Sequence, residues 1–159
     1  MCHPEDLKSG EYLLVSLQHS QALGTPLAEP LIYPARPAPV LVLNPGIQPV
    51  RFYVREGLNG TYHLTVLGGR NVRENPENRR VFAYDDSEVE EYEINYVPNQ
   101  LAYTVVKPGT DYAFTVPRTL REGDSEGNQV TLTPLEWEDE AARRYQRNQL
   151  FAFLPLPAA

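Results

Sequence analysis

A short stretch of the chain surrounds one arginine with prolines: Pro34, Ala35, Arg36, Pro37, Ala38 and Pro39 follow one another. Proline fixes φ and biases the residue before it toward extended geometry, so we expect a stiff loop that presents Arg36. A stiff loop loses little conformational entropy on docking, and its cation could enter an acidic specificity pocket of a protease. The residues therefore suggest a protease-binding loop. A rigid connection with an incidental arginine, or a PxxP ligand, are the other interpretations that stay open.

A second candidate loop runs from Gly68 to Arg80 and carries four arginines and three asparagines. We interpret it as a flexible stretch between two strands, within which residues 71–73 are a candidate for a short strand. Its residues Arg70, Asn71 and Arg73 could meet an acidic partner. They could also balance the acidic run that follows from Asp85 to Glu91.

No grouping of residues indicates catalysis or metal binding. His3, His19 and His63 are scattered along the chain, whereas a metal site needs several ligands that converge on one point. Cys2 lies beside His3 in a terminal segment that we expect to be mobile. The acidic run from Asp85 to Glu91 lacks the oxygen spacing and the turn glycine of an EF-hand loop. We therefore expect no enzyme activity, no cofactor and no metal.

Strand signals that recur three times along the chain would have to position these loops. Each third opens with an apolar strand that has a tyrosine near its start and closes with a second aromatic strand. The opening segments are 11–17, 61–67 and 101–106, and the closing segments are 50–55, 91–97 and 150–154. A repeat of about 40–50 residues with about four strands indicates a propeller blade or a trefoil lobe. Three blades are too few to close a propeller.

The sequence therefore predicts an all-β protein, a β-trefoil with about twelve strands in three lobes. We expect one trefoil domain over residues 10–156, preceded by a mobile segment over residues 1–9. The aromatic residues expected in its core are Tyr12, Phe52, Tyr62, Tyr92, Tyr103 and Phe153. The segment from Glu136 to Gln146 has good helix formers with acids first and bases last, which favours a short helix or an extended loop. Its Trp137 is expected to cover an end of the barrel.

Composition limits the partners. The net charge of −7 and the pI near 5.0 argue against nucleic acid or an anionic membrane as a binding surface. The first residues lack the apolar stretch of a secretory signal, and a lone cysteine cannot form an internal disulfide. We expect a cytoplasmic monomer, with secretion of a mature form left open.

Short motifs in a characteristic order resemble the basidiomycete fungal β-trefoil serine protease inhibitors of the cospin-like family. The motifs include Gly10-Glu11-Tyr12, Arg51-Phe52-Tyr53-Val54, Gly60-Thr61-Tyr62-His63-Leu64, Glu91-Tyr92-Glu93-Ile94, Val130-Thr131-Leu132-Thr133-Pro134 and Phe151-Ala152-Phe153. The resemblance implies that a loop between the second and third strands binds a trypsin-like protease, with Arg36 entering its specificity pocket. Pro37 follows Arg36, and an Arg-Pro bond is a poor trypsin substrate, which either protects the loop or prevents proper docking.

Two other functions remain possible for a trefoil of this sequence. The chain is more distantly similar to the mycocypins, fungal trefoil inhibitors of cysteine proteases. That similarity implies that segments 20–25 and 44–47 wedge into a papain-like cleft, while Asn71 serves an asparagine-specific protease. A ricin-type lectin is the third possibility, although no lobe carries its Gln-x-Trp signature.

Overall fold

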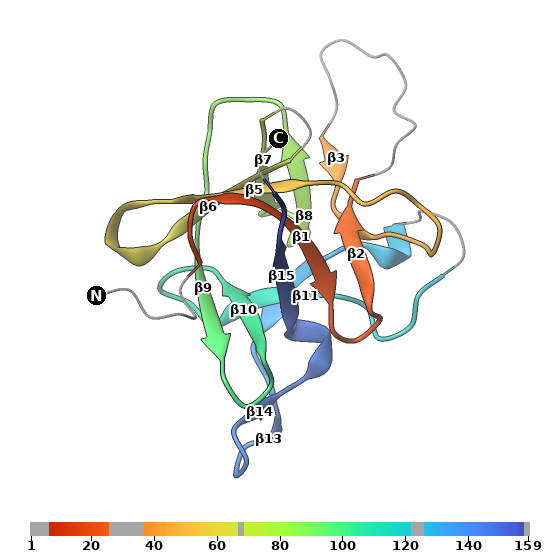
Figure 1. The fold of residues 1–159 in the computed structure, drawn as a ribbon, viewed down its shortest axis with the longest axis vertical. Coiled ribbons are helices and arrows are strands. Elements are labelled where there is room, and N and C mark those ends of the chain that lie inside the picture. Colours follow the sequence, from red (N-terminus) through yellow and green to blue (C-terminus); the bar gives the residue numbers. More distant parts are fainter. Residues whose placement is uncertain (1–6, 26–36, 67–68, 122–125, 158–159) are drawn as a thin grey trace.

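The structure is a computed structural model that describes residues 7–25, 37–66, 69–121 and 126–157 (Figure 1). Its strands are β1 (Gly10–Ser16), β2 (Gln21–Gly24), β3 (Ala38–Pro39), β4 (Leu41–Val42), β5 (Phe52–Glu56), β6 (Tyr62–Val66), β7 (Arg70–Asn75), β8 (Arg80–Tyr84), β9 (Glu91–Val97), β10 (Ala102–Val106), β11 (Tyr112–Thr115), β12 (Thr131–Pro134), β13 (Trp137–Asp139), β14 (Arg144–Tyr145) and β15 (Phe151–Pro155). Single 3-10 turns are η1 (Leu58–Gly60), η2 (Glu126–Asn128) and η3 (Arg147–Gln149). No helix in these ranges is long and apolar enough to cross a membrane.

Six strands close into an antiparallel barrel. The hydrogen-bonded order is β1, β5, β6, β9, β10, β15 and back to β1. In each lobe the first and fourth strands pair through an equivalent aromatic pair, which is Tyr12 and Phe52, Tyr62 and Tyr92, or Tyr103 and Phe151. Alternate residues along these strands face inward, because side chains of a strand alternate between its two faces. The recurring tyrosines of the sequence thus mark one layer of the barrel.

Three hairpins cap one end of the barrel. They are formed by β2 with β4, β7 with β8, and β11 with β12. A ring of backbone hydrogen bonds joins them: Val40 donates to Val81 O (3.0 Å), Val81 to Val130 O (2.9 Å) and Val130 to Val40 O (2.9 Å). All three valines are buried at equivalent positions, so the ring marks the threefold axis of the fold.

The β-trefoil prediction is confirmed. The strands occupy the four positions expected in each lobe, with the third position of the first lobe divided into β3 and β4. The predicted core is confirmed for five of its six aromatic residues, Tyr12, Phe52, Tyr62, Tyr92 and Phe153, which are all buried. Tyr103 is partly buried and packs against the same core.

One expectation about a segment outside the barrel is wrong. Residues 137–145 form the hairpin β13–β14 instead of a short helix or an extended loop, and Trp137 is 40% exposed and stacks on Tyr145 at 4.2 Å. Residues 7–9 are held against the domain, since Leu7 is buried and its carbonyl accepts a hydrogen bond from the Tyr62 hydroxyl (3.0 Å). The first six residues lie outside the described part of the chain.

Candidate functional site

The loop predicted from the prolines falls mainly on residues that the structure does not describe. Pro34, Ala35 and Arg36 lie outside the described residues, while Pro37 is exposed. Ala38 is buried in β3, where it pairs with Ala83 of β8, so it belongs to the cap of the barrel.

The other root of that loop is equally well packed. Gly24, at the end of β2, approaches its neighbours so closely that a Cβ there would lie 2.7 Å from Cδ1 of Leu43. Thr25 is fully buried. The described residues on the two sides of positions 26–36 therefore belong to the trefoil core.

The alternative loop around Arg70 is a strand. Residues 70–75 form β7, which pairs with β8 over residues 71–75, so the expected flexible stretch is wrong and the candidate strand at 71–73 is confirmed. Asn71 is buried and its Nδ2 donates to Asp86 O at 2.7 Å. Arg73 pairs with Asp86 (2.5 Å) and Glu88 (2.7 Å), and its guanidinium lies over the ring of Tyr84. For Arg73, the interpretation that these cations balance the acidic run is confirmed.

The first of the two proposed wedge segments is also mostly strand. Residues 21–24 form β2, and Leu23 is fully buried. Only the turn over residues 17–20 is left at the surface, with Ser20 in the left-handed region at φ 54°. Residues 44–47 do form a turn, closed by a hydrogen bond from Ile47 N to Asn44 O.

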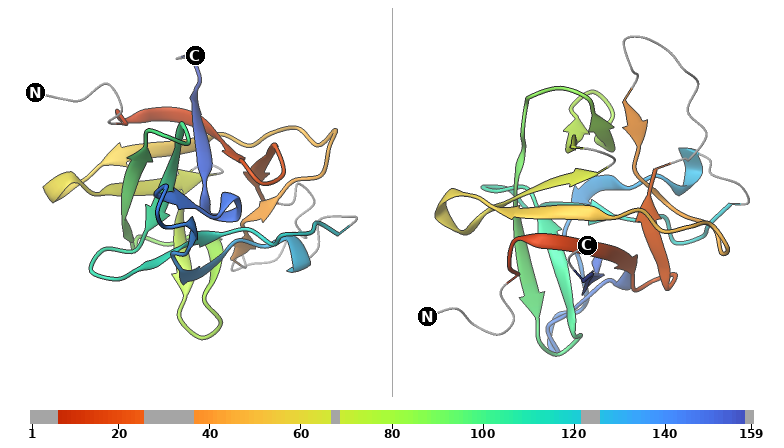
Figure 2. Two further views of the ribbon diagram at one scale, coloured as in Figure 1. Left: turned by 90° about the horizontal axis from the view of Figure 1, so that it is seen from below. Right: turned by 45° about the horizontal axis from the view of Figure 1, so that its top comes forward.

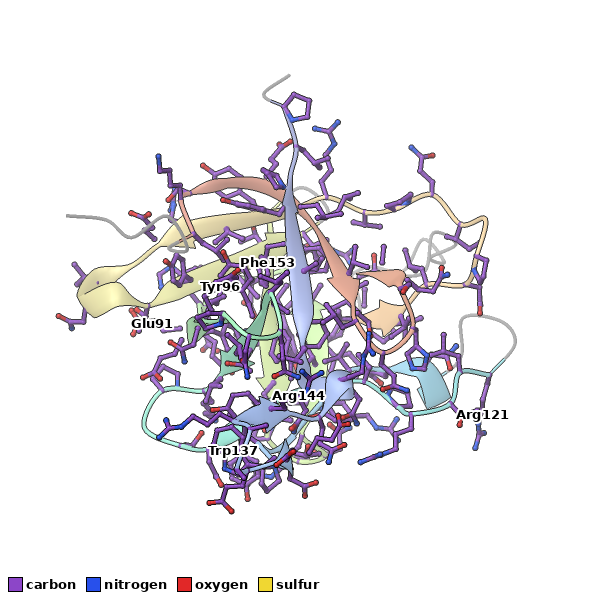
Figure 3. All side chains as sticks on the ribbon, turned by 60° about the horizontal axis from the view of Figure 1, so that its bottom comes forward. Glu91, Tyr96, Arg121, Trp137, Arg144 and Phe153 are labelled. Carbon is purple, nitrogen blue, oxygen red and sulfur yellow. The ribbon has the colours of Figure 1, made fainter. Side chains whose placement is uncertain are left out.

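A loop that the sequence interpretation passed over presents an arginine in a more defined way. Arg121 lies in the connection between β11 and β12 and is exposed at the outer edge of the molecule (Figure 3). Asn128 is fully buried, and its side-chain amide holds the backbone of Arg121 on both sides. Arg121 N donates to Asn128 Oδ1 at 2.8 Å, and Asn128 Nδ2 donates to Arg121 O at 2.9 Å. A Cβ at Gly127 would lie 2.8 Å from Cδ of Arg121. The aliphatic part of the Arg121 side chain therefore packs directly against the backbone of Gly127.

The start of this loop is fixed to two other segments. Val116 N donates to Asn148 O at 2.9 Å, and the amide of Asn148 returns a bond to Val116 O at 3.2 Å. The ring of His19 contacts Pro117 O at 2.5 Å. Arg118 donates to the amide oxygen of Gln146 at 3.2 Å. The exposed Arg121 is thus carried by a loop with restrained backbone at both ends.

A buried polar cluster lies under the β7–β8 hairpin. The Glu74 side chain is 3% exposed and pairs with Lys107 Nζ (2.8 Å) and Arg79 (3.4 Å). The hydrogen bond to Glu74 raises the pKa of Lys107. Burial raises the pKa of the nearby Glu90 carboxyl, whose Oε1 has no hydrogen-bond partner among the described residues. These groups do not converge on a metal site, and the described residues contain no group of three or more histidine, cysteine or acidic residues placed to hold a metal ion.

The peptidase inhibitor I66 family matches residues 5–155 of this chain. The chain belongs to this family. It is therefore a peptidase inhibitor and not an enzyme, and its partner is a protease. The resemblance seen in the sequence is confirmed.

Solved structures with the same fold include the proteinase inhibitor from Coprinopsis cinerea, with a TM-score of 0.78 and 24% identity over 94% of this chain and 99% of that one. The Rhizoctonia solani agglutinin is similar with a TM-score of 0.65 and 13% identity over 97% and 100% of the two chains. The ricin B-like lectin of Macrolepiota procera, solved with lactose, has a TM-score of 0.57 and 14% identity over 94% and 98%. No curated protein matches at a significant level. At these identities the likeness to the solved structures shows the fold alone.

Proposed function

We propose that this chain inhibits a trypsin-like serine protease by inserting an arginine from an exposed loop into the specificity pocket. The observation that carries the proposal is the two-sided hold of Asn128 on the backbone of Arg121. A loop fixed before docking loses little entropy when it binds, and a cleaved bond in a restrained loop stays in place. The exposed guanidinium supplies a charge-assisted, bidentate partner for a pocket carboxylate.

Arg36 remains the arginine that the sequence predicts for the same role. It lies between two strand ends that are anchored in the core, and Pro37 follows it directly. The loop with Arg121 is the candidate that described contacts support, whereas the loop with Arg36 is supported by its prolines and by the family resemblance. Both arginines are candidates for the side chain that enters the specificity pocket, so one set of variants decides between them.

The test is tight-binding titration of trypsin with the unmodified inhibitor, Arg121→Ala, Arg36→Ala and the double variant. The unmodified protein is expected to be a monomer and to titrate one trypsin per chain. Removing one partner of a buried charge pair costs about 2–5 kcal/mol, so loss of the contact arginine should weaken inhibition by at least about 30-fold. Arg55→Ala, at an exposed position on β5, is the matched control and should leave inhibition unchanged.

Each outcome assigns the site. A loss confined to Arg121→Ala places the contact at the β11–β12 loop, and a loss confined to Arg36→Ala places it at the loop between β2 and β3. Full inhibition by the double variant would overturn an arginine mechanism. Absence of trypsin inhibition together with inhibition of papain or legumain would move the chain to the cysteine protease alternative.

A further inference from the structure

A small hollow lies beside the turn between β9 and β10, outside the loops considered so far. It has a volume of about 180 Å³ and is lined by Leu17, Asn99, Gln100, Leu101, Arg144 and Arg147. Leu101 forms its crest: the side chain is 76% exposed and the backbone is left-handed at φ 53°. A leucine rarely adopts this conformation, and residues held in it cluster at functional surfaces. The turn therefore presents an apolar side chain to solvent at an energetic cost.

The hollow is rigid because two amide side chains tie the turn to the β13–β14 hairpin. Gln100 Nε2 donates to Tyr145 O at 3.0 Å, and Tyr145 N donates to Gln100 Oε1 at 2.9 Å. Asn99 Nδ2 donates to Ala142 O (3.0 Å) and Arg143 O (3.2 Å). The positions of Leu101 and of the arginines on the hairpin are thus fixed relative to one another.

The charge of the hollow is opposite to that of the protein. The charged residues that line it are both arginines, Arg144 and Arg147, in a chain with a net charge of −7. Both are exposed, and neither is ion-paired among the described residues. Arg51 and Arg73, by contrast, are each paired with a carboxylate. An apolar crest beside two unpaired guanidinium groups is complementary to a partner surface with carboxylates around an apolar side chain.

The base of the Arg121 loop is hydrogen-bonded to two segments that adjoin the hollow. Arg118, three residues before Arg121, is bonded to Gln146, the neighbour of Arg147. The 17–20 turn begins with Leu17, which lines the hollow, and its His19 contacts the carbonyl oxygen of Pro117. Three extended residues span at most about 11 Å, and a standard interface covers about 800 Å² on each partner, a disc roughly 16 Å in radius. A protease seated on Arg121 would therefore reach Arg118, whose partner Gln146 directly precedes Arg147 of the hollow.

We propose that this hollow is a secondary contact for the target protease, which meets Leu101, Arg144 and Arg147 with an acidic surface beside its active-site cleft. The proposal rests on the function proposed above, with the Arg121 loop as the primary contact. It names the class of target: a trypsin-like protease with acidic residues at the rim of its cleft. Such a contact acts chiefly on the association rate and on its salt dependence, because long-range attraction steers the encounter.

The experiment compares the association rate constants of the inhibitor with an anionic and a cationic trypsin, at low and at physiological ionic strength. Neutralising both arginines in Arg144→Gln/Arg147→Gln should slow association with the anionic trypsin by roughly 10-fold at low salt. Association with the cationic trypsin should not slow. Leu101→Ala should raise the dissociation rate of the anionic complex and leave the salt dependence unchanged.

The matched control is Arg51→Gln/Arg55→Gln, which changes the net charge equally. Arg55 lies on β5, one residue before its end, and Arg51 directly precedes that strand. Neither residue lines the hollow. Every view shows the β5–β6 turn, which follows β5, on the side of the molecule away from the β11–β12 connection (Figures 1 and 2). Equal effects of the two double variants would overturn the proposal, since only overall charge would then matter. Trypsin inhibition without any change in association rate would overturn it and leave the proposed function intact. Absence of inhibition of either trypsin would overturn both.

Discussion

At the scale of single residues, the candidate site depends on one buried amide. Asn128 has no exposure of its own, yet it determines the backbone of an exposed arginine through two hydrogen bonds. An asparagine amide is suited to this task because it carries both an acceptor and a donor group. Its contribution is to the shape of the loop, whereas Arg121 supplies the charge.

Asn128→Ala should therefore convert the protein from an inhibitor that resists cleavage into one that the protease slowly cleaves and inactivates. Two hydrogen bonds are lost, worth about 1–3 kcal/mol together, and the loop gains freedom that a protease can exploit for cleavage. The measurement is inhibitor cleavage by catalytic amounts of trypsin, followed by mass spectrometry. Asn128→Asp keeps the acceptor for Arg121 N and should be cleaved at an intermediate rate. Equal cleavage of all three proteins at matched melting temperatures would refute this role.

The pH dependence of stability can be assigned in part to Glu90. Burial raises the pKa of this carboxyl above its ordinary value near 4.3. The folded state then holds the proton more tightly than the unfolded state, so stability falls as the pH rises from the unfolded pKa through the folded pKa.

Glu90→Gln should remove this loss. Relative to the unmodified protein, the variant should gain stability on going from pH 4 to pH 7, because glutamine has no charge to bury. Urea unfolding at several pH values measures the difference. A difference between the two proteins that stays constant with pH would contradict the assignment.

At the scale of elements, the barrel strands could be predicted from the sequence, whereas β7 could be predicted only over residues 71–73. The barrel strands alternate apolar and polar residues with a recurring tyrosine, which is the pattern of a half-buried strand. The buried residues of β7 include Asn71 and Glu74, on opposite faces of the strand, which are satisfied by Asp86 O and by Lys107. Buried polar residues interrupt the alternation of apolar and polar residues by which a strand is recognised, and the partners that make their burial possible are distant in the sequence. The segment therefore has the sequence pattern of a flexible loop.

For a related reason, the sequence of the β13–β14 hairpin predicts a short helix or an extended loop. Acids followed by bases fit a helix dipole, but the same order fits a hairpin whose first strand is acidic and whose second is basic. Among the described residues, Asp139 and Arg144 are opposite in register without an ion pair, whereas Trp137 stacks on Tyr145 at 4.2 Å. An aromatic cross-strand pair of this kind stabilises antiparallel strands. The hydrogen bonds between Asn128 and the backbone of Arg121 could not be predicted either, because neither propensity nor periodicity indicates a side-chain contact between residues seven positions apart.

Gln100 should control whether the hairpin stays docked. Gln100→Ala removes both bonds to the backbone of Tyr145, and the three residues of β13 are exposed and add little to the core. We expect greater acrylamide quenching of Trp137, the single tryptophan of the chain, with only a small change in melting temperature. Gln18→Ala, at an exposed position on a neighbouring turn, is the control. Unchanged quenching in Gln100→Ala would show that other contacts hold the hairpin.

At the scale of the whole molecule, threefold repetition separates stability from binding. The barrel layer and the valine ring recur in every lobe, and the core aromatic residues pack through edge-to-face contacts such as Tyr92 with Phe114 at 5.1 Å and Phe114 with Phe151 at 6.5 Å. The connections between strands differ from lobe to lobe. The Arg121 loop and the β13–β14 hairpin both belong to the third lobe, so binding residues can vary while the core is kept.

The separation predicts a large stability loss from a core truncation and little from its neighbour on the same strand. Phe52 is 1% exposed and lies opposite Tyr12, where the first and fourth strands of the first lobe pair, while Tyr53 is 43% exposed. Phe52→Ala should lower the free energy of unfolding by about 3–5 kcal/mol, because a buried ring is lost and a cavity remains. Tyr53→Ala should lower it by no more than about 0.5 kcal/mol, as expected for a surface change. Urea unfolding followed by far-UV circular dichroism measures both, and a loss below about 1 kcal/mol for Phe52→Ala would contradict the assignment of this ring to the barrel core.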